Sequence, residues 1–331
     1  MRNDRFCMLA VRFLRANLRL GRGYGYPPSL RRSKPSCYIT RSLFFSDAGD
    51  TFGFSRRRPG ETIAAGRGRH LPAVADNDSS DRPRRNEVCS AMAVNDAVSV
   101  AAIGIICKAP QPGRAKTRLA TAVGAVAASE LSACFLRDVA AAIDAVPETL
   151  GRRGYGVYAP AGVEHIMRDL LPATFGLLLQ VGDDLGDVLF GAALDLLSDG
   201  HDCVLLVNGD SPTLPARFLV QAIETLREPG DRMVLGPASD GGYYLIGLKH
   251  AHRRLFTEIA WGTETVARST CERAAEIGLA MALLPEWYDI DDIEALGWLK
   301  DELAGNSTRF RGGGLAPASR AFLDAAPQIS P

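Results

Sequence analysis

The sequence has no long hydrophobic run and no closely spaced cysteine pair. No apolar stretch approaches the roughly 18–20 residues that span a bilayer, and Arg12, Arg15 and Arg19 interrupt the N-terminal candidate. The seven cysteines occur singly, without a CxxC pair, and several lie inside apolar segments. These absences argue against membrane insertion and structural zinc. They predict buried thiols in a reducing compartment, and therefore a cytoplasmic protein.

The first 91 residues also lack a sustained hydrophobic period. They hold 18 Lys and Arg against 8 Asp and Glu, whereas the other 240 residues hold 20 against 30. We therefore predict a disordered, Arg-rich extension over residues 1–91, with translation from Met92 as a working hypothesis. A nucleic-acid arm, a transit peptide and an upstream stretch that is not normally translated are the alternatives. Because the aromatic residues are too scattered to form a stacking platform, we predict no nucleic-acid partner.

From residue 99 the chain alternates short Val, Ile and Leu runs with amphipathic or Ala-rich stretches. This pattern predicts an α/β fold, with helices on both faces of a mainly parallel sheet. Strands are expected at residues 99–108, 155–161, 176–180, 203–208 and 280–284, with two more inside 232–249. Helices are expected at about 120–146, in a short stretch between residue 161 and Leu171, and at about 185–197, 216–227, 264–278 and 291–303. The two strands inside 232–249 have no helix between them, which predicts a mixed sheet. The predicted domain spans residues 92–303, and the tail at 304–331 is predicted to be disordered.

The segment VLLVNGDSPTLP, residues 204–215, ends a buried strand in a loop that carries Asp210. Gly209 and Pro212 turn the chain where the strand stops. In open α/β sheets such strand ends are where ligands bind. A carboxylate there can hold Mg²⁺ or Mn²⁺ together with nucleotide phosphates. The alternative is that Asp210 only caps the following helix.

A basic loop, KAPQPGRAKTRLA (108–120), follows the first predicted strand. Its prolines and Gly113 bend the chain, and Arg114, Lys116 and Arg118 place three cations within five residues. Such a loop before a helix is typical of phosphate binding, because an anion relieves the repulsion between the cations. It is not a Walker A loop, since GxxxxGK[ST] is absent. A solvated basic loop is the alternative.

The segment GPASDGGYYLIG (236–247) places Asp240 before two glycines, which can let the backbone approach a ligand. Tyr243 and Tyr244 then enter a strand on opposite faces, so one of them is expected to face the cleft. A tight Asp-Gly hairpin is the alternative.

Three acids, Asp289, Asp291 and Asp292, surround the start of the last predicted helix. Capping explains one of them. Asp289 or Asp291 could supply a second carboxylate to the cation at Asp210. Trp261 could belong to the core or offer an acceptor a stacking surface.

Six motifs occur in order between about residues 100 and 300, namely KAPQPGRAKTRL, QVGDDLG, GDSPTL, PASDGGYYLIGL, WGT and DIDDIEAL. With them the chain resembles the bacterial glycosyltransferase-A-like family that includes arsenosugar-biosynthesis-type glycosyltransferases. It is more distantly similar to the molybdopterin and phospholactate guanylyltransferases. The resemblance implies a single-domain, three-layer α/β/α nucleotide-diphospho-sugar transferase. It also implies that Lys116 and Arg118 meet donor phosphates, that Asp210 takes the metal, and that Asp289 or Asp291 lies near it. One departure follows Leu185 and Gly186: the motif commonly continues LGxRM, whereas here Asp187, Val188 and Leu189 follow, so a cation near the cleft is missing.

Together with this resemblance, these patterns predict a metal-dependent glycosyltransferase that uses a nucleotide-sugar donor and a small-molecule acceptor. Asp240 is the candidate base and Lys116 a catalytic cation, while Asp210, Asp289 and Asp291 are the candidate ligands of Mg²⁺ or Mn²⁺. The residues predicted to bind nucleotide or phosphate are Lys108, Pro110, Gly113, Arg114, Lys116, Thr117, Arg118 and Gly209. The resemblance implies that the DGGYY turn lines the acceptor side, and the residues expected there are Gly241, Gly242, Tyr243, Tyr244 and Trp261. The alternatives are a nucleotidyltransferase that releases pyrophosphate and a nucleotide-binding module without catalysis.

Overall fold

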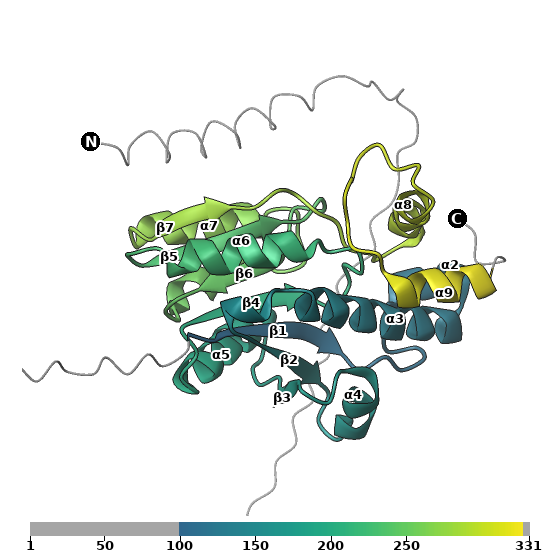
Figure 1. Cartoon of the computed structure of the whole chain (residues 1–331), viewed down its shortest axis with the longest axis horizontal. Coiled ribbons are helices and arrows are strands. Elements are labelled where there is room, and N and C mark those ends of the chain that lie inside the picture. The colour runs from purple at the N-terminus through teal and green to yellow at the C-terminus, as the bar shows by residue number, and fades with distance from the viewer. Residues whose placement is uncertain (1–98, 327–331) are drawn as a thin grey trace, which may run out of the picture. The chain divides into compact units, whose positions relative to one another are not determined.

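One mixed sheet of seven strands organises residues 99–326, the part of the chain that the computed structural model describes (Figure 1). The strands are β1 (Ala101–Lys108), β2 (Arg152–Ala159), β3 (Gly176–Leu179), β4 (Cys203–Asn208), β5 (Arg232–Pro237), β6 (Tyr243–Leu248) and β7 (Ala280–Leu283). Their order is β3-β2-β1-β4-β6-β5-β7. Only β6 runs antiparallel to its neighbours, β4 and β5. The predicted mainly parallel, mixed sheet is therefore confirmed.

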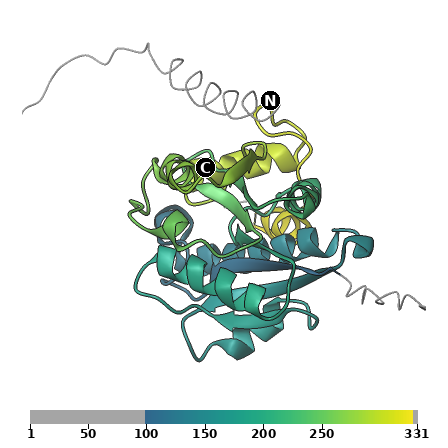
Figure 2. The same cartoon turned by 90° about the vertical axis from the view of Figure 1, so that its left-hand side faces the viewer.

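Helices cover both faces of this sheet (Figures 1 and 2). One face carries α3 (Ala125–Asp144), α4 (Glu164–Leu170) and α6 (Ala216–Arg227), and the other carries α5 (Leu185–Ser198) and α7 (Val266–Glu276). The remaining helices are α2 (Thr117–Val123), α8 (Ile293–Leu303) and α9 (Pro317–Ala325), with short 3₁₀ turns η1 (Glu148–Leu150) and η2 (Arg253–Phe256). The layers agree with the predicted three-layer arrangement.

Strand β4 lies between these two layers and is buried on both faces. Leu205 and Val207 join the apolar core with α3 and α6, whereas Val204 and Leu206 join the core with α5. This two-sided burial explains the unbroken apolar run in the sequence. The strand ends at Asn208, so the following loop, which contains Asp210, emerges at the carboxyl edge of the sheet.

The predicted disordered tail is wrong as far as residue 326, because α9 packs along α3 (Figure 1). The carboxylate of Asp138 in α3 accepts hydrogen bonds from the backbone N–H groups of Ala318 and Ser319, at 2.9 and 2.8 Å. The Ser319 hydroxyl donates a third, at 2.6 Å. A side chain from another helix therefore satisfies the first N–H groups of α9, and no local pattern reveals that partner.

Three of the predictions lie outside the described residues: the Arg-rich extension over 1–91, the start at Met92, and the last part of the predicted tail, residues 327–331. Within residues 99–326, Cys107, Cys134 and Cys203 are buried free thiols and Cys271 is partly buried. No helix of these residues combines the length and apolar character needed to cross a bilayer.

Candidate active site

Three chain segments that are distant in sequence meet around the ammonium group of Lys116. Its Nζ atom lies 2.8 Å from Oδ2 of Asp210 and 2.6 Å from Oδ1 of Asp291. The Lys116 side chain is only 5% exposed, whereas the two carboxylate side chains are 37% and 48% exposed. Burial alone would lower the pKa of Lys116, but Asp210 and Asp291 hold that pKa above its ordinary value. The lysine is therefore a fixed cation between two carboxylates.

Backbone hydrogen bonds bring the loop at residues 287–291 to the end of β4. The N–H of Ile290 donates to the carbonyl of Asp210 at 3.0 Å, and the Ser211 hydroxyl donates to the carbonyl of Tyr288 at 2.7 Å. Ser239, beside Asp240, donates its N–H to the carbonyl of Trp287 at 2.9 Å. The loops that carry the acidic side chains are thus joined to one another directly.

Lys116 has a left-handed backbone, with φ 50° and ψ 50°. This conformation is uncommon for a residue with a Cβ atom, and such residues are found disproportionately at functional sites. Lys116 is the residue just before α2, and no side chain caps that helix. The ammonium contacts with Asp210 and Asp291 fix its side chain in this position.

Asp289 adds a third carboxylate to the group around Lys116. Burial raises its pKa to about 7, and the charges of Asp240, Asp291 and Asp210 act in the same direction, while Lys116 opposes them. Three other carboxylates therefore act on Asp289, in a region with one buried ammonium. The region lies at the end of β1, where burial and then Asp210 raise the pKa of Cys107 to about 12.

The capping alternatives for these acids are now decided. Helix α6 begins at Ala216 with Pro215 as its N-cap, so Asp210 does not cap it. Asp292 caps α8 by accepting a hydrogen bond from the N–H of Ala295 at 2.9 Å. Asp289 and Asp291 are not needed for that role.

The carboxylate donor set suits a hard divalent cation, since Mg²⁺ and Mn²⁺ prefer oxygen ligands. The excess of negative charge around Asp289 supports the same fit. The ligand atoms of Asp210, Asp289 and Asp291 are nevertheless not gathered within 4.8 Å of one another, unlike those of one other cluster in the described residues. In this arrangement Lys116 lies between Asp210 and Asp291.

The rest of the basic loop is open to solvent. Lys108, Arg114, Thr117 and Arg118 are exposed, and within residues 99–326 the three cations among them make no ion pair. Pro110 and Gly113, with φ 76°, shape the turn. Lys116 itself is already paired with two carboxylates, Asp210 and Asp291. Lys108, Arg114 and Arg118 can still bind an anion, because they are exposed and make no ion pair within residues 99–326.

Close packing explains Gly241 in the DGG turn. Its φ is +91°, and a Cβ atom there would lie 2.2 Å from the carbonyl oxygen of Glu264. The glycine is thus required where the turn packs against the segment before α7. The N–H of Gly242 donates to Oδ1 of Asp240 at 2.8 Å, which orients this exposed carboxylate.

The two tyrosines after this turn lie in different environments. Tyr244 has no exposed surface, and its hydroxyl donates to the carbonyl of Pro285 at 2.9 Å, so it does not fit the predicted acceptor side. Tyr243 is partly exposed and meets Trp261 edge to face, with ring centroids 6.4 Å apart. Trp261 lies over the start of α5, where a Cβ atom on Gly186 would be 3.0 Å from its Nε1 atom.

Gln180 begins the QVGDDLG motif, but the sequence assigned it no role, and Arg253 was not singled out from the sequence. The Gln180 amide donates to the carbonyls of Cys107 and Val157, at 2.9 and 2.8 Å, and so ties together the ends of β1 and β2. A polar residue directly after an apolar strand was the available signal. Arg253 pairs with Asp187, which occupies the variable position of the LGxRM motif, next to the departing Val188 and Leu189.

Replacing Asp289 with asparagine is expected to stabilise the protein above pH 7. A carboxyl whose folded pKa exceeds its unfolded value of 3.8 destabilises the folded state increasingly as pH rises from about 4 to 7. The Asp289→Asn variant should melt roughly 5 °C higher at pH 8, for a gain on the order of 2 kcal/mol, and the difference should shrink towards pH 5. Differential scanning calorimetry in a chelating buffer measures this. The exposed Asp301→Asn control should show no such trend, and a pH-independent difference for Asp289→Asn would contradict the assignment.

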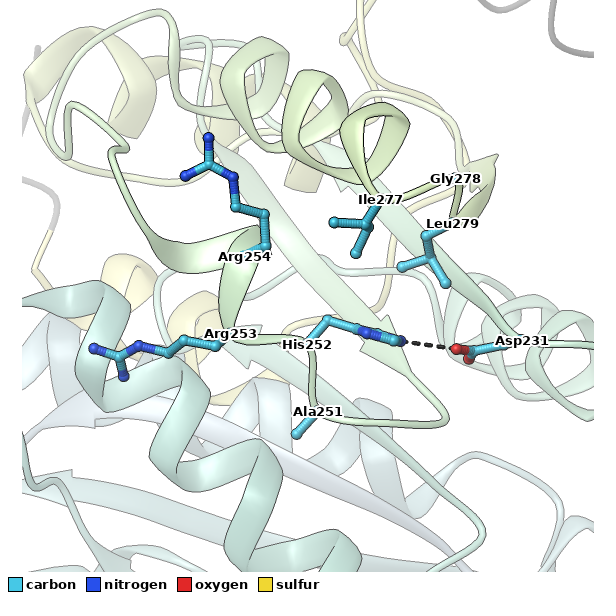
Figure 3. Close-up of a pocket in the computed structure, with 8 residues that line it drawn as sticks. All are labelled: Asp231, Ala251, His252, Arg253, Arg254, Ile277, Gly278 and Leu279. Carbon is cyan, nitrogen blue, oxygen red and sulfur yellow. Dashed lines mark hydrogen bonds and ion pairs between the residues drawn. The ribbon is translucent and has the colours of Figure 1, made fainter.

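A cavity of about 390 Å³ lies at the other edge of the sheet, next to the starts of β5 and β7 (Figure 3). Its lining residues are Asp231, Ala251, His252, Arg253, Arg254, Ile277, Gly278 and Leu279. None of the predicted site residues lines it. The charge cluster around Lys116 is therefore the better candidate for an active site.

Comparison with protein families gives a partial match. A family described as "Uncharacterized protein conserved in bacteria (DUF2064)" matches residues 143–263, a range that contains Asp210 and Asp240. No curated protein matches the chain.

Among solved structures, a Desulfovibrio desulfuricans G20 protein, provisionally described as a nucleotide-diphospho-sugar transferase, is 27% identical with a TM-score of 0.60. The match covers 69% of this chain and 96% of that one. CMP:2-keto-3-deoxy-manno-octonic acid synthetase complexed with CTP is 12% identical, with a TM-score of 0.43 and coverage of 63% and 100%. Glucosyl-3-phosphoglycerate synthase from Mycobacterium tuberculosis is also 12% identical, with a TM-score of 0.38 and coverage of 63% and 79%. The predicted three-layer, glycosyltransferase-A-like fold of nucleotide-diphospho-sugar transferases is confirmed by the first of these.

Proposed function

We propose that the protein is a metal-dependent glycosyltransferase that transfers a sugar from a nucleotide-diphosphate donor to a small-molecule acceptor. The observation that carries the proposal is the buried Lys116 ammonium held between Asp210 and Asp291 at the carboxyl edge of the sheet. Ligands of open α/β sheets bind at this edge. The 27% identity to a relative described as a nucleotide-diphospho-sugar transferase, over 96% of that chain, supports the same class.

The basic loop is proposed to receive the donor diphosphate. Arg114 and Arg118 are exposed and without ion pairs within residues 99–326, so they can bind phosphate oxygens without breaking existing contacts. Arginine forms charge-assisted hydrogen bonds to phosphate, and Lys108 adds a further exposed cation. Lys116 provides a preoriented positive charge for the departing nucleoside diphosphate.

Asp210, with Asp289 and Asp291, is proposed to hold Mg²⁺ or Mn²⁺. When bound, such an ion stabilises negative charge on the leaving diphosphate. Burial first, and then the charges of Asp240, Asp291 and Asp210, raise the pKa of Asp289, so a bound cation would favour the ionised form of this carboxyl. Asp210 lies in the loop directly after the buried β4, which ends at Asn208.

Asp240 is proposed as the base that accepts the proton of an acceptor hydroxyl. Its carboxylate is exposed, and Gly242 holds one oxygen and leaves the other for an acceptor. Tyr243 and Trp261 supply aromatic surface beside the DGG turn, which suits a sugar-like or aromatic acceptor. A cytoplasmic location is retained as a prediction from the cysteine pattern.

The first test of this function is a nucleotide screen. Nucleoside diphosphates should raise the melting temperature with Mg²⁺ or Mn²⁺ present and much less with a chelator, because ligands that bind only the native state stabilise it. Donor sugars carrying the preferred base should then release nucleoside diphosphate in the presence of acceptors. Release of pyrophosphate from a nucleoside triphosphate would instead identify a nucleotidyltransferase. Tight nucleotide binding without turnover of any donor would identify a binding module.

A further inference from the structure

A second group of ligand-type side chains lies at the sheet edge opposite the candidate active site. Within residues 99–326, Asp231, His250 and His252 are the only three such side chains whose ligand atoms all lie within 4.8 Å of one another. Nδ1 of His250 lies 3.0 Å from Oδ1 of Asp231, and Nε2 of His252 lies 2.8 Å from Oδ2. One carboxylate therefore faces two imidazoles.

The strand register explains this grouping. Strands β5 and β6 pair antiparallel, with Met233 opposite Leu248. Continuing that ladder by two residues places Asp231 opposite His250. Alternate residues of an extended chain project to the same side, so His252 joins them. Figure 3 shows the His252 side chain pointing to Asp231 and Ala251 pointing elsewhere.

The turn before β5 is held in place before any ligand binds. The Lys249 ammonium donates to the carbonyls of Glu228 and Gly230, each at 3.0 Å. The Arg232 guanidinium donates to the carbonyl of the intervening proline at 2.7 Å. Because this turn is already ordered, binding of a ligand to Asp231 loses little backbone conformational entropy.

Other cations near this edge already have partners. Arg253 pairs with Asp187, and Arg254 pairs with Glu258 and Glu276. They do not compete for Asp231. The adjoining cavity leaves Asp231 and His252 open to solvent on one side, with side chains 35% and 29% exposed, so water could fill further coordination positions (Figure 3).

We propose that Asp231, His250 and His252 form a binding site for a divalent transition-metal ion such as Zn²⁺, separate from the carboxylate cluster at Lys116. Two imidazole nitrogens and one carboxylate oxygen are a donor set that Zn²⁺ uses, whereas Mg²⁺ and Ca²⁺ prefer oxygen alone. With bonds of about 2.0–2.1 Å, tetrahedral ligand atoms lie roughly 3.3 Å apart, close to the spacings seen here. The cysteine pattern argued against structural zinc, but it has no bearing on a histidine and aspartate site.

Bound zinc would join the turn before β5 to the segment after β6. That segment continues through η2 along α5 and reaches Trp261 near the candidate active site. The metal would therefore stabilise the sheet edge at the start of β5 and the end of β6, where the segment that leads through η2 to Trp261 begins. The geometry of Asp231, His250 and His252 defines this site whether or not the protein transfers a glycosyl group.

Zinc titration of the metal-stripped full chain tests the proposal, with millimolar Mg²⁺ present to occupy the carboxylate cluster. The wild type should bind one Zn²⁺ with high affinity, and His252→Ala should weaken binding at least about 100-fold, because it removes a direct ligand. His165→Ala is the matched control, since His165 is exposed on α4. If the three residues form only ordinary ion pairs, the wild type will bind no Zn²⁺ at about 100 µM, or His252→Ala will bind it equally well, and either result overturns the proposal.

A second measurement needs no substitution and is insensitive to folding defects of a variant. In imidazole ¹H–¹⁵N spectra of the wild type, one equivalent of Zn²⁺ should shift the nitrogen signals of His250 and His252 while leaving His165 unchanged. Unshifted signals from both histidines at saturating Zn²⁺ would also overturn the site.

Discussion

Replacing Asp210 with asparagine should lower glycosyl-transfer turnover by about 10³-fold or more, because it removes the carboxylate proposed to anchor the metal. The substitution keeps the size of the side chain, so Ser211 and Ile290 can keep their contacts with the loop. Asp291 remains as a partner of Lys116. The loss should therefore appear in kcat, with the melting temperature close to that of the wild type. Release of nucleoside diphosphate from the donor found in the screen measures it.

The matched control for this experiment is Asp183→Asn. Asp183 is an exposed acid at the same edge of the sheet, between β3 and α5, and it belongs to no proposed site. Its replacement should leave turnover within about twofold, as for most surface substitutions. If Asp210→Asn retains most of the wild-type activity, Asp210 does not anchor a catalytic metal and the proposed mechanism fails.

Lys116→Met should destabilise the protein by roughly 1–3 kcal/mol at pH 8, which is less than a fully buried pair would lose because Asp210 and Asp291 are partly exposed. The variant leaves carboxylates close together without their central cation. Millimolar Mg²⁺ or Mn²⁺ should restore much of the lost stability if those carboxylates can hold a divalent ion. Thermal melts with and without the metal measure both effects.

Lys249→Met tests whether the metal effect is specific to the site. It removes a partly buried ammonium from the opposite sheet edge, where the partners are backbone carbonyls. Its melting temperature should respond to Mg²⁺ or Mn²⁺ no more than that of the wild type. An equal metal response in the two variants would mean that the carboxylates near Lys116 do not form a cation site.

Local sequence patterns predicted most strands and helices, because each element carries its own pattern of apolar residues. The run Val204–Val207 is apolar at every position since β4 is covered on both faces. Helix α9 was missed because its start is fixed by Asp138, which lies 181 positions before Ser319 in the chain. The tail carries glycines and little apolar pattern, so nothing nearby identified the partner.

The candidate site was predicted as separate pieces and not as an arrangement. Asp210, Asp289 and Asp291 each stood out as acids at the end or start of an element. The alternation of Tyr243 and Tyr244 predicted opposite faces, but it could not say which face is open. Gly241 was interpreted as a place for ligand approach, whereas the carbonyl of Glu264 is what excludes a side chain there.

By itself, the sequence determined most of the elements and their order, although not α9, and it placed charged residues at the ends of those elements. The tertiary structure alone decided that Lys116 is paired, that Asp210 caps no helix, and that Asp231 faces two histidines. The physical reason is distance along the chain. Lys116 and Asp291 are 175 positions apart, and strand order and loop-to-loop hydrogen bonds bring them to 2.6 Å, which neither periodicity nor spacing encodes.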